Sequence, residues 1–113
     1  MWQVVFHPRA MPDLAELPPR ERVAILNDVE KRRMLGPALP FPHQSNVRGS
    51  EDLRELHPRA GRSAWRGLYR RIGNAFVIAA VGPEAETSPR AFARAVQEAV
   101  TRLKEIEPEG GTT

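Results

Sequence analysis

Hydrophobic and polar residues alternate in four short segments and recur at helical spacing in longer ones. The alternation predicts strands over residues 2–6, 52–57, 64–72 and 75–81. Apolar residues three or four apart predict helices over 19–35 and 89–107, preceded by a helical turn over 12–17. On the helix over 19–35 we expect Val23, Leu26 and Val29 to form the buried stripe and Asp28 and Arg32 to be solvated. This order predicts an α+β fold, a small antiparallel sheet of about four strands with two N-terminal helices and a C-terminal helix.

Gly73-Asn74 separates two of these strands and predicts a hairpin with a two-residue turn. The register of that turn places Arg66 opposite Val81. One face then carries the bulky apolar side chains Trp65, Tyr69, Phe76 and Ile78. We expect the helices to pack on this face, and the other face, which presents Arg66 and Arg70 over small aliphatic residues, to remain open as a basic cleft.

The chain of 113 residues suits one domain, expected over residues 1–107, with a disordered tail over 108–113. It has no cysteine, which excludes disulfides, thiolate zinc sites and a cysteine nucleophile. No apolar run is long enough for a transmembrane helix, and the first residues do not form a signal peptide. We therefore expect a cytoplasmic protein with no membrane partner. Residues 37–50 hold three of the eleven prolines and predict a long loop.

Positive charge is concentrated in the middle of the chain. The net charge is +3, and fifteen of the seventeen basic residues are arginine. Residues 48–71 hold seven arginines against three acids, whereas the segments on either side are nearly balanced or acidic. A GC-rich genome also favours arginine, so the composition alone is ambiguous. The clustering is what predicts a surface for polyanions.

The candidate chemistry comes from arginines, aromatic residues and one histidine. Arg54, Arg66 and Arg70 could hold phosphates, Trp65 and Tyr69 could stack bases, and His57 could act as a general acid or base. Such a set would suffice for RNA cleavage without a metal, and the three histidines lack metal-ligand spacing. These residues could instead have structural roles. Trp65 and Tyr69 could be core residues, and His57 could be the last residue of a strand.

The ordered segments resemble a known family. Leu53-Arg54-Glu55-Leu56-His57 and Trp65-Arg66-Gly67-Leu68-Tyr69 are similar to two strand motifs of the RelE/ParE toxin superfamily, and an aliphatic strand and a proline-started helix follow them. The resemblance is to the phage-related HigB-like branch of type II toxin–antitoxin systems and covers about residues 2–106. No single motif is specific, so the resemblance depends on their order.

The resemblance implies a toxin that cleaves mRNA on the ribosome, without metal or cofactor, by attack of the 2′-hydroxyl. It implies a cognate antitoxin, often a helix-turn-helix protein through which the pair contacts operator DNA. Arg54, Arg66 and Tyr69 stand at positions that match the family and, together with His57, are the catalytic candidates. The RNA-binding candidates, Arg48, Arg62 and Arg70, come from the cluster of arginines.

Two departures from the family pattern bear on activity. Its lysine pair after the third core strand is replaced by a segment containing Glu84 and Glu86, and His57 stands where arginine is usual. The hairpin register also places Tyr69 on the face opposite Arg66. A degenerate toxin that binds RNA without cleaving it, or a ParE-like gyrase inhibitor, therefore remains an alternative.

Overall fold

A computed structural model of the chain describes residues 2–39, 44–49 and 52–106. The strands are β1 (Gln3–Phe6), β2 (Gln44–Asn46), β3 (Arg54–Leu56), β4 (Trp65–Ile72) and β5 (Ala75–Pro83). The α-helices are α1 (Ala10–Ala15), α2 (Pro19–Leu35) and α3 (Pro89–Ile106), and short 3₁₀ turns cover Gly36–Ala38 (η1) and Pro58–Gly61 (η2). The predicted α+β class is confirmed. The tail predicted over 108–113 lies outside the described residues.

The sheet has the strand order β1-β5-β4-β3-β2. It is mixed, because β1 runs parallel to β5 while the other neighbours are antiparallel. The expectation of a purely antiparallel sheet of about four strands was therefore wrong in this detail. The additional strand, β2, lies in the segment predicted to be a loop and has only three residues, too few to show a period of two.

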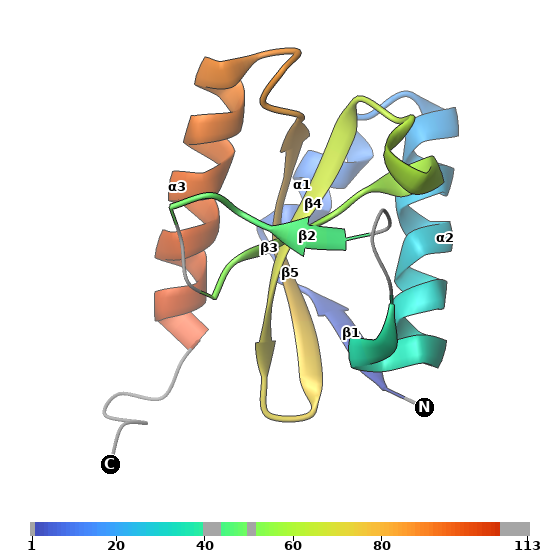
Figure 1. Ribbon diagram of the computed structural model, residues 1–113. Coiled ribbons are helices and arrows are strands. Elements are labelled where there is room, and N and C mark those ends of the chain that lie inside the picture. Colours follow the sequence, from blue (N-terminus) through green and yellow to red (C-terminus); the bar gives the residue numbers. More distant parts are fainter. Residues whose placement is uncertain (1, 40–43, 50–51, 107–113) are drawn as a thin grey trace.

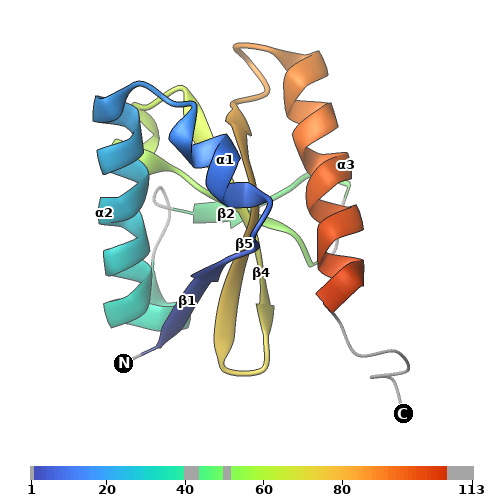
Figure 2. The ribbon, with the colours of Figure 1, turned by 180° about the vertical axis from the view of Figure 1, so that it is seen from behind.

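Helices cover both faces of the sheet, with α1 and α2 on one side and α3 on the other (Figures 1 and 2). Tyr69, Phe76 and Ile78 pack with α1 and α2, as predicted. Leu68 and Val77 of the opposite face pack with Ala95, Ala99 and Leu103 of α3. The expectation of an open basic face was therefore wrong, because the apolar stripe of α3 requires a surface to bury.

The hairpin follows its predicted register only near the turn. Tyr69 lies opposite Ile78, but an irregularity between Leu68 and Tyr69 shifts the pairing, and Arg66 lies opposite Gly82 rather than Val81. A bulge of this kind changes which face the residues beyond it occupy. Val81 accordingly packs in the core on the α1 and α2 side, and not beside Arg66.

The buried face of α2 is rotated from the predicted one. Ile25 and Val29 are buried, but so are Asp28 and Arg32, which we expected to be solvated. Val23 and Leu26, in contrast, are exposed. The prediction followed hydrophobicity alone, whereas Arg32 on the buried face donates a hydrogen bond to Tyr69 of β4.

Gly36 ends α2 beside the first strand. Its φ is +57°, and a Cβ built on it would lie 2.2 Å from Trp2 Nε1. Only glycine satisfies both conditions without strain. Trp2 in turn packs against Phe76 and is joined to α2 by a hydrogen bond from its N–H to the carbonyl of Arg33. Within the described residues, no helix has the length and apolarity needed to span a membrane.

Candidate functional site

Glu55, His57 and Arg66 form a cluster of charged side chains on the sheet face that α3 partly covers. His57 Nε2 lies 3.3 Å from Glu55 Oε1, and Arg66 Nε lies 3.4 Å from the same carboxylate oxygen. Ser45 Oγ of the edge strand β2 is 3.0 Å from His57 Nε2. The cluster thus joins a carboxylate, an imidazole, a guanidinium and a hydroxyl from three neighbouring strands and the residue that follows β3.

The strand period explains why these residues meet. Glu55 and His57 are two positions apart, and Glu55 pairs across the sheet with Leu68, so that both lie on the same face as Arg66. Pro58 follows immediately and begins η2, which ends the extended segment at His57. The Glu55 and His57 side chains keep 16% and 14% of their surface exposed, so a ligand can reach them.

Arg66 is buried and held from several directions. Its Nη1 donates to the carbonyl oxygens of Ser63 and Trp65 at 2.7 and 2.9 Å, and its Nη2 donates to Glu84 Oε2 at 2.7 Å. The carboxylate of Glu84 therefore neutralises the buried guanidinium of Arg66, and it does not simply add negative charge to the surface. The guanidinium is fixed in direction, as a group that acts on a charged transition state must be.

The remaining sequence-predicted site residues do not join this cluster. Arg54 and Tyr69 face each other across β3 and β4 and border a cavity on the α2 side of the sheet together with Arg70. Arg54 and Glu55 are consecutive residues of one strand, so their side chains project to opposite faces. Arg48 and Arg62 are exposed in the segments after β2 and η2. The predicted catalytic set thus falls into two pairs on opposite sides of the sheet.

Tyr69 is a core residue with a polar partner. It is 1% exposed, and its hydroxyl accepts a hydrogen bond from Arg32 Nη2. Burial raises the pKa of this hydroxyl, an effect that Arg32 and Arg54 partly offset. A neutral, buried phenol cannot remove a proton at neutral pH, so its place in the structure suits positioning Arg32.

Sequence reasoning missed two residues of these clusters, Glu55 and Arg32. Glu55 alternates with His57 on a predicted strand, and this spacing already places a carboxylate beside the candidate acid or base. Arg32 follows Ile25, Asp28 and Val29 at helical spacing, so polar residues recur within one helical stripe. A search for apolar stripes alone passes over such positions.

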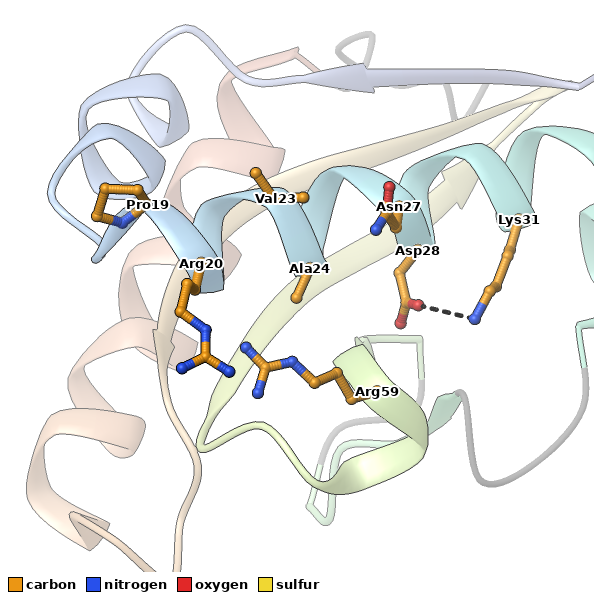
Figure 3. Close-up of a pocket in the computed structure, with 8 residues that line it drawn as sticks. All are labelled: Pro19, Arg20, Val23, Ala24, Asn27, Asp28, Lys31 and Arg59. Atoms are coloured by element: carbon orange, nitrogen blue, oxygen red, sulfur yellow. Dashed lines mark ion pairs between the residues drawn. The ribbon is translucent and has the colours of Figure 1, made fainter.

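A further cavity, with a volume of about 620 Å³, lies along α2. Val23 and Ala24 line its wall, and Arg20 of α2 and Arg59 of η2 reach toward each other across it (Figure 3). The carboxylate in its lining is that of Asp28, which is buried and lies 3.8 Å from the ammonium group of Lys31. Within the part of the chain that the structure describes, the lining contains no histidine, so it does not offer the carboxylate–imidazole pair found at the other site. Among the described residues, no group of three histidines or carboxylates is arranged to hold a metal ion.

Comparisons with known proteins agree with the fold. The family model described as phage derived protein Gp49-like (DUF891) matches residues 12–104. No curated protein matches the chain in a sequence search. Among solved structures, a double arginine-to-alanine mutant of the E. coli toxin RelE in the free state has a TM-score of 0.65 at 20% identity, and the match covers 90% of this chain and 97% of that one.

Two further structures are complexes. The toxin–antitoxin complex RelBE2 from Mycobacterium tuberculosis has a TM-score of 0.56 at 24% identity, covering 74% of this chain and 98% of that one. The archaeal RelE–RelB complex from Pyrococcus horikoshii OT3 has a TM-score of 0.50 at 22% identity, covering 73% and 93%. These matches show that the chain has the fold implied by the resemblance to the RelE/ParE superfamily. The chain belongs to the phage-derived Gp49-like family, and its fold is that of RelE.

Proposed function

We propose that this chain is the toxin of a type II toxin–antitoxin pair and that it cleaves messenger RNA during translation. The fold and the family membership support the toxin assignment. The observation that carries the cleavage assignment is the Glu55–His57–Arg66 cluster, in which one carboxylate oxygen lies within 3.4 Å of both an imidazole and a guanidinium nitrogen. Metal-independent RNA cleavage needs a base, an acid and a fixed positive charge.

The proposed reaction assigns one role to each group. A base, Glu55 or His57, takes the proton of the ribose 2′-hydroxyl, whose oxygen then forms a bond to the adjacent phosphorus. The bond from phosphorus to the 5′ oxygen breaks, and the other member of the pair gives its proton to that oxygen. The products are a 2′,3′-cyclic phosphate and a 5′-hydroxyl end. Arg66 stabilises the extra negative charge that develops on the phosphate.

One observation favours a second function, RNA binding without cleavage. Every terminal nitrogen of Arg66 already has a partner, and Glu84 lies 2.7 Å from Nη2. A phosphate that approaches Arg66 must displace this carboxylate or bind beside it. If it cannot do so, the chain occupies its target without breaking it.

The partner we propose is a cognate antitoxin, with operator DNA contacted only through it. Support comes from two of the similar structures, which are complexes of RelE with RelB. A helix-turn-helix antitoxin and the ribosome as the site of action follow from the sequence resemblance. Copurification of tagged chain with the product of a small adjacent reading frame would test the antitoxin.

The experiment that tests cleavage maps RNA 5′ ends after brief induction of the chain in bacterial cells. We expect new 5′-hydroxyl ends inside translated messages. His57→Gln and Glu55→Gln should each reduce them by about 100-fold or more, since general acid–base groups contribute on this scale. Arg90→Gln, a change at an exposed arginine of α3, is the control that should leave them unchanged.

The outcomes separate the two functions. New ends that persist at full level in both site variants would contradict the assigned residues. Growth arrest without new ends, with the chain shown to be folded by circular dichroism, would favour RNA binding without cleavage. A folded chain that causes no growth arrest and produces no new RNA ends would contradict the toxin assignment itself.

A further inference from the structure

A second charged cavity lies on the opposite side of the sheet from the Glu55–His57–Arg66 cluster. It has a volume of about 490 Å³ and is bordered by β3, β4 and the C-terminal end of α2. Its described lining contains four arginines, Arg32, Arg54, Arg70 and Arg71, and one carboxylate, Asp52. We call it the arginine cleft. Neither residue proposed for acid–base chemistry reaches it.

Arg32 is the most unusual residue of the arginine cleft, because it is a buried cation with neutral hydrogen-bond partners. It is 3% exposed. Its Nη1 donates to the carbonyl oxygen of Gly36 at 2.8 Å and its Nη2 to the Tyr69 hydroxyl, while Nε is buried without a partner. Asp28, one helical turn earlier, acts on the charge of Arg32, but Gly36 and Tyr69, to which the guanidinium donates, are neutral. Burying a guanidinium is costly, so this arrangement favours an anion as a further partner.

Aromatic rings hold this guanidinium in place. Its central carbon lies 4.7 Å from the ring centroids of both Tyr69 and Phe76. Burial lowers the pKa of Arg32 and nearby Arg54 lowers it further, whereas Tyr69 and Asp28 act in the other direction. Two cations therefore crowd one another in a partly dry cavity. An anion between them would relieve that repulsion.

Two other arginines of the cleft, Arg54 and Arg71, also have neutral partners. Arg54 Nη1 donates to Gln44 Oε1 at 2.7 Å, and Arg71 Nε donates to the carbonyl of Gly73 at 3.0 Å. The guanidinium carbon of Arg71 lies 4.9 Å from the Trp2 ring. Neither guanidinium is committed to a carboxylate among the described residues. Both can turn their remaining N–H groups toward a phosphate, which arginine binds through two parallel hydrogen bonds.

We propose that the arginine cleft binds a backbone phosphate of single-stranded RNA. This inference rests on the proposed function in taking RNA as the ligand, but it does not depend on cleavage. The strand geometry explains how one RNA could use both faces. Arg54 and Glu55 are neighbours that point to opposite sides of β3, and of the described strands only the short edge strand β2 lies beyond them. An RNA anchored in the cleft can pass around this edge toward His57.

The test uses the full chain and a short RNA with 2′-O-methyl groups, which cannot be cleaved by 2′-hydroxyl attack. Its binding is followed by ¹H–¹⁵N NMR, with the Arg32 Nε–H resonance as reporter, and inorganic phosphate is titrated separately. We expect the RNA to shift the Arg32 resonance. The double variant Arg54→Gln/Arg71→Gln should weaken RNA binding about tenfold at low salt. It should also reduce the salt slope by about 0.7, because one phosphate neutralised on a single strand contributes about 0.7 to that slope.

The matched control, Arg90→Gln/Arg94→Gln, removes the same charge from exposed positions of α3. Equal weakening in both double variants would overturn the proposal, because net charge would then explain the binding. A response of Arg32 to phosphate but not to RNA would also overturn it, in favour of a free phosphate or nucleotide. This test does not measure cleavage, so its result is independent of the proposed reaction. A chain that binds RNA through the arginine cleft but does not cleave it would contradict the proposed reaction and support this inference.

Discussion

Replacing Tyr69 by Phe would test whether the buried pair of Arg32 and Tyr69 stabilises the fold. The change keeps the aromatic ring, with its 6.1 Å centroid distance to Phe76, and removes only the hydroxyl. Arg32 Nη2 then loses its acceptor, beside an Nε that already lacks one. A buried charged donor without a partner is more costly than the same group in water.

The magnitude follows from the type of hydrogen bond. Bonds to charged groups contribute about 1.5–3 kcal/mol, so Tyr69→Phe should lower the free energy of unfolding by about 2 kcal/mol. Arg32→Met removes the cation instead, while the Gly36 carbonyl keeps the hydrogen bond from the N–H of Leu39. In that background Tyr69→Phe removes a hydroxyl that has already lost its bond from Arg32, and it should cost about zero. The expected coupling between the two sites is therefore about 2 kcal/mol.

Equilibrium unfolding in urea, followed by circular dichroism, measures all four proteins of this double-mutant cycle. The slopes must agree, so that the midpoints report stability alone. A coupling below about 0.5 kcal/mol would refute the reasoning, because groups that do not interact are additive to about that limit. It would mean that Arg32 obtains its stabilisation from the rings or from solvent.

Three further outcomes are expected. Gly36→Ala should lower the free energy of unfolding by about 3 kcal/mol, because the positive φ strains alanine and its Cβ would collide with Trp2. Gly73→Ala, which has a similar φ but open surroundings, should cost about 1 kcal/mol in the same urea assay. Burial lowers the pKa of His7, and the charges of two nearby arginines lower it further. The Nδ1 atom of His7 accepts a hydrogen bond from a backbone N–H. As the pH is lowered, His7 therefore binds a proton in the unfolded chain before it does so in the folded one. The free energy of unfolding should fall as the pH drops below about 6.5. The His7→Asn variant should lose less stability over the same pH range. Arg102→Gln should cost about 2 kcal/mol in thermal or urea unfolding, because Nη1 joins a carboxylate of α1 to a carbonyl of β5 at 2.9 Å each; a loss below about 0.5 kcal/mol would contradict that role.

Most helices and strands could be predicted from the sequence alone, because their signals are local. The periods of two and 3.6 and the Pro and Gly boundaries identify α2, α3, β1, β4 and β5 to within a few residues. The Gly73-Asn74 turn fixes the hairpin register as far as Tyr69. The side chain of Tyr69 is therefore predictably opposite that of Arg66, and this parity already divides the predicted catalytic set.

Which faces of the sheet and of α2 are buried depends on tertiary contacts. The bulge beyond Tyr69 and the docking of α3 bury the face predicted to be open, and both depend on contacts between residues far apart in sequence. The same holds for Arg32 and Asp28. A charged residue on a helix is expected in water unless distant groups satisfy it, and no local pattern reveals those groups. The pairing of Arg66 with Glu55 and Glu84 likewise joins three separate segments. The candidate chemistry was visible in the residue types, but its arrangement arises from long-range packing.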